Sequence, residues 1–282
     1  MQPVHRGREE FGGRLRALRE EAGLTGTALA ARLGWPNSKV SKIEHGRQTA
    51  TGVDVTAWVA AVDGSAEMLA DLLADLRSVR LEYRSWARML RRGTAARQRA
   101  VVPPDASTSL LRAFEPALVP GLLQTAEYAR WVLRGVVGLR DLPDDVTEGV
   151  KARLERQQAL YDPGKQFRFL VTEAGLRYLV CPPQVLKGQL DRLLAVAGLP
   201  NIELGVLRFT AQLPYPALHG FWIYDDGLVL VNTVSAELAL RDGDDIALYE
   251  KLFEMLWSRA VSGPEAIAVI NAANHEFSRA PS

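Results

Sequence analysis

The sequence has little cysteine and no long apolar run. Cys181 is the single cysteine among 282 residues, so an internal disulfide is impossible and no oxidising compartment is required. No apolar run approaches the roughly 20 residues that a membrane-spanning helix needs, and the first residues, MQPVHRGREEF, lack the apolar core of a signal peptide. We therefore expect a cytoplasmic protein without a membrane segment, in which Cys181 is a small buried side chain.

The sequence also lacks the signatures of metal sites and of common catalytic sites. The histidines His5, His45, His219 and His275 are scattered and follow no His/Cys ligand spacing. There is no Gly-rich phosphate loop, nucleophile elbow, zinc-protease helix or kinase signature. The acidic residues around Gly243 lack the regular spacing and the final Glu of a calcium loop. We expect a protein that is not an enzyme and that holds no metal or other cofactor.

What the sequence does contain is an uneven distribution of charge. Its net charge of +1 conceals the difference between two parts. Residues 1–100 hold 17 of the 34 Lys and Arg residues but 11 of the 33 Asp and Glu residues, and the remainder holds 17 and 22. A surplus of basic residues is typical of a surface that binds nucleic acid. The charge therefore predicts such a surface within the first hundred residues.

Four short amphipathic helices are predicted in the first part of the chain, because apolar residues recur there at spacings of three and four. They cover residues 11–22, 25–34, 36–46 and 53–62. Gly34 can take the positive φ of a tight turn after the second helix. Ala30 is small where two helices cross, and Val40 docks the third helix onto the second. This spacing predicts a helix-turn-helix whose third helix presents its start to a major groove.

The start of the third helix carries four polar side chains that can reach the edges of bases: Asn37, Ser38, Ser41 and Lys42. The segments LRALREEAGL, ALAARLG and SKVSKIEHGR resemble the λ-repressor-like, or xenobiotic-response-element, family of DNA-binding domains over about residues 11–75. The resemblance implies that Asn37, Ser38 and Lys42 read bases. It also implies a buried ion pair between Arg19 and Glu44, which fixes the first helix against the third.

Contacts with the DNA backbone follow from the same resemblance. It implies that Lys39 and Arg47 meet phosphates. The family often has Gln where this chain has Gly26, so the hydroxyls of Thr25 and Thr27 are expected to anchor the DNA backbone instead. The expected partner of this region is a double-stranded DNA operator.

A much longer helix is predicted from Ser65 to about Gly93. Apolar residues from Leu69 to Leu90, spaced alternately by three and four, form a heptad seam. A stripe of arginines runs beside the seam: Arg77, Arg80, Arg84, Arg88 and Arg91. The seam predicts a homodimer or packing within the chain. The stripe is interpreted as a phosphate contact, a salt-bridged face or a solvated face, and these alternatives stay open.

The rest of the chain mixes strand and helix patterns. Strands are predicted over residues 167–172, 202–207, 221–224 and 228–232, and helices over 125–133, 146–160, 183–197, 245–259 and 264–274. Asp225-Asp226-Gly227 is a hairpin turn between the last two strands. We expect an α+β protein: an all-α helix-turn-helix domain (1–75), a long basic connecting helix (65–100) and a mixed α/β domain with a small sheet (101–282).

The second half also resembles a known group. The segments LLRAFEPALVPGLLQTAEYAR, RLERQQ, FLVTEAGLRYL, QLDRLL and NIELGVLRF are similar to the C-terminal domain of WhiJ-like, antitoxin-like regulators of actinomycetes. The resemblance implies a transcriptional regulator, a repressor or autoregulator. Its C-terminal domain would bind a small protein encoded by a neighbouring gene, in a toxin-antitoxin-like or developmental switch. The alternative is a ligand-sensing regulator with a small-molecule pocket in the same domain.

Candidate residues for either role follow the turn at Pro120-Gly121. Gln124 and Tyr128, together with Arg156 and Gln157, are predicted to line a groove for a partner or a pocket for a ligand. A second interpretation is equally open at this point. Tyr128 would then belong to the core, and Arg156 and Gln157 would brace that core by hydrogen bonds.

Overall fold

The computed structural model describes residues 3–48, 50–80, 82–85, 89–90, 93–100, 107–216 and 218–278. The chain divides into two units, residues 1–82 (unit 1) and residues 83–282 (unit 2), and each is described by itself. Within the described ranges, none of the helices combines the length and the apolar character needed to cross a membrane.

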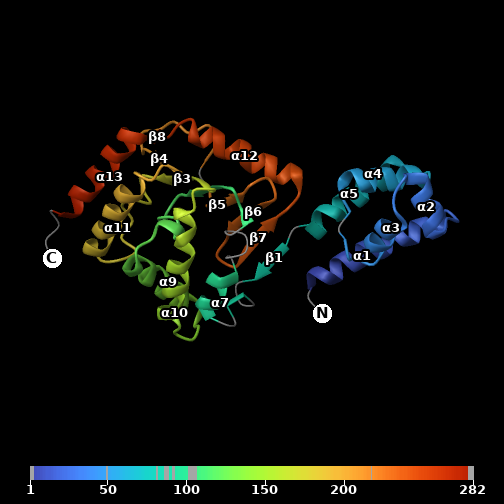
Figure 1. Cartoon of the computed structure of the whole chain (residues 1–282), viewed down its shortest axis with the longest axis horizontal. Coiled ribbons are helices and arrows are strands. Elements are labelled where there is room, and N and C mark those ends of the chain that lie inside the picture. The colour runs from blue at the N-terminus through green and yellow to red at the C-terminus, as the bar shows by residue number, and fades with distance from the viewer. Residues whose placement is uncertain are drawn as a thin grey trace. The chain divides into compact units, whose positions relative to one another are not determined.

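Unit 1 is a bundle of helices, drawn in blue to teal in Figure 1. It contains α1 (Pro3–Glu21), α2 (Gly26–Leu33), α3 (Asn37–Glu44), α4 (Gly52–Ala61) and α5 (Ala66–Arg80). Leu15, Leu29 and Trp58 are fully buried in its core. The indole N–H of Trp58 donates a hydrogen bond to the carbonyl of Leu15 at 3.2 Å, which joins α4 to α1. The four short helices predicted from periodicity are confirmed.

Two local features set the angle between the helices of unit 1. Gly34 has a φ of 64° and ends α2, in the left-handed conformation that a residue with a Cβ rarely adopts. Gly12 allows α1 to approach the end of α3, because a Cβ at this position would lie 2.4 Å from the carbonyl oxygen of Ile43. The first and third helices therefore meet almost backbone to backbone.

The continuous helix predicted over residues 65–93, and with it the connecting helix 65–100, is wrong. Helix α5 ends at Arg80, strand β1 (Glu82–Ser85) follows, and α7 (Gly93–Ala100) comes next among the described helices. The backbone groups of β1 pair with a neighbouring strand at the end of a sheet instead of within a helix. Gly93 has a φ of 86°, which is incompatible with the interior of an α-helix. The side chains of the arginine stripe lie outside the described residues.

The heptad seam is divided between two cores. Leu72 and Leu76 are buried in the core of unit 1, and Leu69 packs against that core. Leu90 is buried in unit 2. These leucines therefore pack inside the chain and do not indicate a dimer interface. The homodimer stays a prediction.

Unit 2 is built around a mixed sheet. Its strands, besides β1, are β2 (Leu110–Glu115), β3 (Gln166–Thr172), β4 (Ile202–Leu207), β5 (Phe221–Tyr224), β6 (Leu228–Asn232), β7 (Ala236–Leu240) and β8 (Val261–Ser262). In the described part of the chain the strand order is β1-β7-β6-β5-β2-β3-β4-β8. Strands β2, β3 and β4 are parallel, whereas β5, β6, β7 and β8 run antiparallel to their neighbours. The α+β class is confirmed, and the sheet is wider than predicted.

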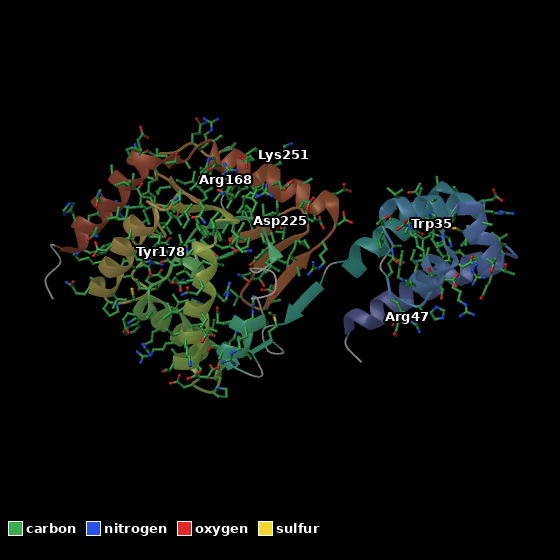
Figure 2. All side chains as sticks on the ribbon, in the orientation of Figure 1. Trp35, Arg47, Arg168, Tyr178, Asp225 and Lys251 are labelled. Atoms are coloured by element: carbon green, nitrogen blue, oxygen red, sulfur yellow. The ribbon has the colours of Figure 1, made fainter. Side chains whose placement is uncertain are left out.

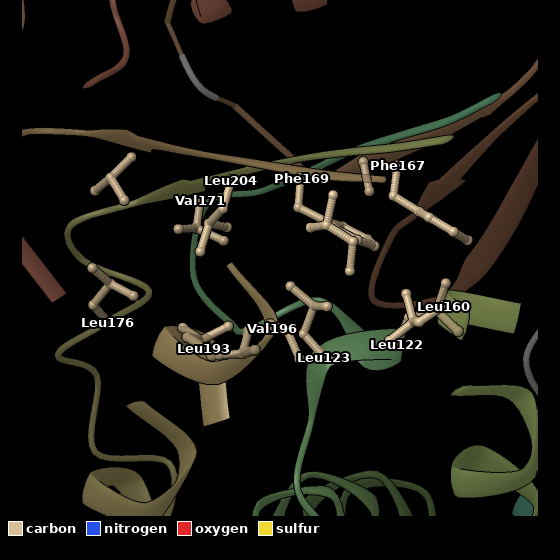
Figure 3. Packing of buried hydrophobic residues seen from close by; sticks show 14 of the residues in the cluster. Leu122, Leu123, Leu160, Phe167, Phe169, Val171, Leu176, Leu193, Val196 and Leu204 are labelled. Carbon is tan, nitrogen blue, oxygen red and sulfur yellow. The ribbon is translucent and has the colours of Figure 1, made fainter. Parts of the chain in front are cut away.

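Helices cover both faces of this sheet (Figure 1). Helices α11 (Pro183–Val196) and α13 (Gly263–Ser278) pack on one face, where α9 (Ala126–Arg140) and α10 (Val146–Arg156) add a further layer. Helix α12 (Gly243–Trp257) packs on the other face. Figure 3 shows the first of these cores, in which Phe169 and Val171 of β3 face Leu193 of α11. The predicted helices and strands of this half are confirmed, with α9 and α13 longer than expected and α10 shorter, since a 3-10 helix (Gln157–Tyr161) follows it.

The hairpin turn between β5 and β6 has a structural role that its sequence did not indicate. Asp225 adopts a positive φ of 49° and is labelled in Figure 2. Its carboxylate accepts hydrogen bonds from the amides of Ser109 and Leu110 at 3.0 and 2.8 Å. An acidic turn residue therefore fixes the start of β2.

Candidate nucleic-acid interface and buried cavity

The four predicted base-reading residues share one exposed face of α3. Asn37, Ser38, Ser41 and Lys42 are exposed, whereas Val40 and Ile43 are buried in unit 1. Residues separated by about one helical turn lie on the same side of a helix, so the polar and the apolar sets point in opposite directions. We call these four residues the α3 row. The helix that carries the row is held by its apolar face and presents its polar face to a partner.

The predicted ion pair between Arg19 and Glu44 is confirmed. Arg19 donates from Nε to Glu44 Oε1 at 2.6 Å and from Nη2 to Oε2 at 3.1 Å, and the two side chains are 8% and 7% exposed. A third hydrogen bond runs from Nη1 to the carbonyl of Leu24 at 2.7 Å. The hydrogen bonds that Arg19 donates to the carboxylate of Glu44 raise the pKa of Arg19. This bidentate pair fixes the end of α3 to α1.

Lys39 has an intramolecular partner that sequence reasoning missed. Its Nζ lies 2.7 Å from Asp54 Oδ1 and 3.8 Å from the centre of the ring of Trp35, which is labelled in Figure 2. Asp54 also accepts the amide of Thr51 at 2.8 Å and so caps α4. Burial acts to raise the pKa of Asp54, but the hydrogen bonds from Lys39 and Thr51 outweigh it and leave the pKa below its usual value. The phosphate contact predicted for Lys39 would compete with these interactions.

The other predicted phosphate-binding residues are accessible. Arg47 is exposed just after α3 (Figure 2), and Thr25 and Thr27 are exposed at the start of α2. The hydroxyl oxygen of Thr25 accepts the amide of Ala28 at 3.1 Å, and its O–H remains a donor. The start of α2 therefore presents a hydroxyl donor and a helix N-terminus on the same surface, which suits a phosphate.

The surplus of basic residues does not lie in unit 1. Residues 1–82 hold 11 Lys and Arg and 11 Asp and Glu, whereas residues 83–100 hold six arginines and no acidic residue. Within the first hundred residues, the basic surplus that predicted a nucleic-acid surface is thus confined to residues 83–100. Among the predicted DNA contacts of unit 1, Lys42 and Arg47 are exposed basic residues.

The second polar site is a cavity in unit 2 with a volume of about 550 Å³. It is bounded by α7, α9 and α10 and by the sheet strands β2, β5, β6 and β7. Its charged and amide side chains come from several of these elements: Arg97, Gln98, Glu115, Gln124, Arg140, Arg153, Arg156, Asn232 and Glu237. Gln124 and Arg156 were predicted from sequence, and the structure brings them together with residues that are distant along the chain.

Arg153 is the most buried of the cavity's arginines. It donates hydrogen bonds to the amide oxygens of Gln124 and, at 3.4 Å, of Gln98. Arg156 donates to the same oxygen of Gln98 at 2.7 Å. Burial, with the nearby charges of Arg156 and Arg97, lowers the pKa of Arg153 to about 9. Two guanidinium groups are thus held side by side by neutral amides.

The acidic groups of the cavity lie on the sheet. Glu115, in β2, accepts the indole N–H of Trp222 at 2.7 Å, and burial raises its pKa to about 7. Glu237, in β7, forms an ion pair with Arg97 of α7. Glu115, Glu237 and Arg97 were not predicted as site residues. For the two glutamates the available signal was a charge within a short apolar segment, which by itself is common on solvated faces.

The remaining predicted residues of unit 2 have structural roles. Tyr128 is fully buried, its hydroxyl accepts the amide of Val119 at 3.4 Å, and burial raises its pKa to about 12. Gln157 donates from Nε2 to the carbonyl of Gln124 at 2.6 Å. The second interpretation, in which Tyr128 belongs to the core, therefore describes this tyrosine, and Gln157 supports the cavity residue Gln124.

The geometry of unit 1 defines a DNA-binding protein of the helix-turn-helix class, and residues 10–77 match the model of the family described as "Helix-turn-helix domain". The chain is thus a DNA-binding regulator. Residues 98–272, more than half of the chain, match the family described as "Domain of unknown function (DUF5753)", and the chain belongs to that family. No curated protein matches the chain.

Three solved structures show a distant similarity. Nuc from Salmonella typhimurium, a phospholipase D family member, has a TM-score of 0.37 at 10% identity, over 65% of this chain and 97% of its own. NucT from Helicobacter pylori has a TM-score of 0.38 at 11% identity, over 65% and 98%. TrmBL2, an archaeal chromatin protein, has a TM-score of 0.34 at 12% identity, over 75% and 69%. Likenesses of this size carry no argument about the site.

Proposed function

We propose that this protein is a sequence-specific transcriptional regulator that binds its operator through α3. The observation that supports it most directly is the exposed α3 row on a helix whose opposite face, Val40 and Ile43, is buried in the core of unit 1. A helix held in this way enters the major groove with its side chains already placed. The amide of Asn37 suits adenine, and the ammonium of Lys42 suits guanine.

Repression, including repression of its own gene, is the outcome that we propose for this binding. Arg47 and the start of α2 position the domain on the phosphates, and the α3 row selects the sequence. A domain seated in the groove of a promoter excludes other proteins from the same DNA. Repression therefore requires only that the operator overlap the promoter.

For unit 2 we propose a sensing role, in which its cavity binds a small molecule. Its volume of about 550 Å³ falls within the range of roughly 300–1,000 Å³ that is typical of ligand pockets. We further propose binding without chemical transformation. Cys181 is buried, as expected, and burial raises its pKa to about 11, so its nucleophilic thiolate is scarce at neutral pH.

A small protein partner is the second candidate for unit 2. The loop after β3 exposes Tyr178, Leu179 and Val180, and Phe209 is also exposed, near Arg177 of that loop. Exposed apolar residues that gather in one place are typical of surfaces that bind proteins. This surface supports the toxin-antitoxin-like or developmental switch implied by the resemblance. Co-purification of a protein encoded by a neighbouring gene would test it, with Leu179→Ser as the variant expected to release that protein.

Selection of bound duplexes from a random-sequence library, with the full-length chain, tests DNA recognition. The Asn37→Ala/Lys42→Ala variant is expected to bind the selected sequence about a hundredfold more weakly, since each base contact contributes about 1–3 kcal/mol. Arg16→Ala, which removes an exposed positive charge from α1, is the matched control and should select the wild-type sequence. Unchanged selection by the double variant, with an unchanged circular dichroism melt, would contradict the role of α3.

The same selection tests the homodimer. Two inverted half-sites about 10 base pairs apart in the selected sequence would support it. A single half-site, bound by a particle of 31.0 kDa protein mass in light scattering, would contradict it.

A further inference from the structure

The cavity of unit 2 has an excess of positive charge. Its lining in the described part of the chain includes four arginines and two glutamates: Arg97, Arg140, Arg153, Arg156, Glu115 and Glu237. One glutamate, Glu237, forms an ion pair with Arg97. The other, Glu115, accepts from Trp222, and the shift of its pKa to about 7 leaves part of its population uncharged at neutral pH. The lining is therefore complementary to a negative charge.

Arg153 is the centre of this excess. Its hydrogen bonds end on the amide oxygens of Gln98 and Gln124, which carry no formal charge. Burial opposes the charge of its guanidinium, and so do the neighbouring guanidinium groups of Arg156 and Arg97, whereas the charge of Glu115 favours it. An anion bound between Arg153 and Arg156 would stabilise the charged form of Arg153, because an opposite charge favours the charged form of a buried group.

The rest of the cavity wall is apolar. Val132, Leu133 and Val136 of α9 line one side, and Trp222 and Leu230 of the sheet line another. A wall of this kind contributes by removing an apolar surface from water. The volume of about 550 Å³ suits a small organic molecule and is far too small for a folded protein or a duplex.

We propose that the cavity binds a small organic anion, a carboxylate or phosphate group on an apolar body, with Arg153 and Arg156 holding the anionic group. The wall formed by α9 holds the body. This inference rests on the sensing function proposed above, because it specifies the ligand class of the same cavity. A guanidinium matches carboxylate and phosphate equally well, by paired hydrogen bonds. Experiment has to decide between a carboxylate and a phosphate as the anionic group.

Helix α7 connects this site to unit 1 along the sequence. It carries Gln98, which accepts from both Arg153 and Arg156 of α10, and it follows residues 83–92, with which unit 2 begins. Its start is fixed by Asp145, which accepts the amide of Thr94 at 2.9 Å. An anion that contacts Arg153 and Arg156 changes the groups that hold Gln98. Ligand binding therefore acts on α7, which among the described helices of unit 2 comes first after the boundary between the units.

Calorimetric titration of the full-length protein without DNA tests the proposal, with octanoate, octyl phosphate and octanol as probes. The three probes share an apolar body and differ in the head group. At least one anion is expected to bind about tenfold more tightly than octanol, because its charge is met by two guanidinium groups. The tighter of the two anions identifies the head group. Equal binding of octanol and both anions, or no heat from any probe, would overturn the proposal.

Variants of one helix provide the control. Arg156→Gln is expected to weaken binding of the better anion by about tenfold, whereas Lys151→Gln, which removes an exposed charge from the same helix, should leave it unchanged. If Arg156→Gln does not fold, Val136→Glu replaces it. This variant places a carboxylate on the half-buried wall and should weaken the anions more than octanol. Unchanged anion binding in the folded variant would also overturn the proposal.

Operator affinity measured with and without the better anion separates the two proposals for unit 2. A changed affinity that is lost in Arg156→Gln supports both. Anion binding without any change in operator affinity supports the anion site and contradicts the sensing function. A protein that binds its operator but none of the anions contradicts the anion site and leaves DNA recognition intact.

Discussion

Unit 1 and unit 2 place their polar side chains in opposite ways. In unit 1 the α3 row is exposed, and the residues beneath it, Val40 and Ile43, hold the helix in the core. In unit 2 Arg153 and Gln124 are buried and turn toward an interior cavity. A row on a convex helix can meet only a partner large enough to have a groove. A cluster inside a cavity can meet only a molecule small enough to enter.

The same difference sets the electrostatics of the two sites. Contacts between surface charges and DNA are screened by salt, so the contacts proposed for the α3 row and Arg47 would compete with ions and water. In the cavity of unit 2, burial of the lining side chains alters both kinds of charge in the direction of neutrality. It lowers the pKa of Arg153 to about 9 and raises the pKa of Glu115 to about 7. Binding at a surface site thus depends on where its exposed side chains lie, whereas binding in a cavity depends on which charged groups line it together.

One exception to this contrast in unit 1 is the buried pair of Arg19 and Glu44, and its loss gives the largest expected effect. Arg19→Ala leaves the carboxylate of Glu44 buried without its partner, which is expected to cost about 3–5 kcal/mol of the free energy of unfolding. Arg16→Ala removes an arginine from an ion pair with Glu20 in which both side chains are about half exposed, and should lower the free energy of unfolding far less. Urea denaturation followed by circular dichroism measures both. Equal losses would show that burial does not distinguish the two pairs.

A smaller effect is expected from pH in unit 2. Burial raises the pKa of Glu115 from 4.5 to about 7, so the folded state binds its proton more tightly than the unfolded chain does. The stability of unit 2 therefore falls as the pH rises from about 4.5 to about 7, by up to about 1.4 kcal/mol for each unit of the shift.

Glu115→Gln removes this titration and keeps an oxygen that can accept the indole N–H of Trp222. Thermal melts at pH 5, 6 and 8 are expected to show that the wild type loses stability relative to the variant. Glu127→Gln, at an exposed site on α9, is the control and should follow the wild type. Parallel pH dependence of Glu115→Gln and the wild type would place Glu115 in contact with water.

The two units also differ in how far their sequences predict them. The helix-turn-helix follows from residues a few positions apart, such as Ala30 and Gly34, because a turn and a helix crossing are local features. The cavity joins Glu115 to Trp222 across 107 positions and Arg97 to Glu237 across 140. The spacing of nearby residues cannot predict pairs so far apart in the sequence. A charged residue in a strand pattern therefore looks the same whether it faces solvent or a cavity.

The incorrect helix has a related cause. The seam continues with the same spacing from Leu69 to Leu90, but Leu76 packs in the core of unit 1 and Leu90 in unit 2. Spacing shows that apolar residues share a face and does not show which core they enter. Helix α5 ends at Arg80, before the seam does, and Gly93, inside the connecting helix predicted over residues 65–100, takes a positive φ that glycine adopts readily.

The smallest expected effect lies within unit 1 and concerns how two predicted phosphate contacts respond to salt. Each phosphate contact contributes about 0.9 to the slope of log K against log salt concentration. Arg47 is exposed, so Arg47→Gln should lower the slope by about 0.9. Lys39 is held 2.7 Å from Asp54 and over Trp35, so Lys39→Gln should lower it by clearly less. Fluorescence anisotropy of a labelled operator, titrated at several salt concentrations, measures both slopes. Equal decreases in the two slopes would show that Lys39 leaves Asp54 and contacts a phosphate when DNA binds. The ion pair of Lys39 in the DNA-free protein would then not predict which side chains contact DNA.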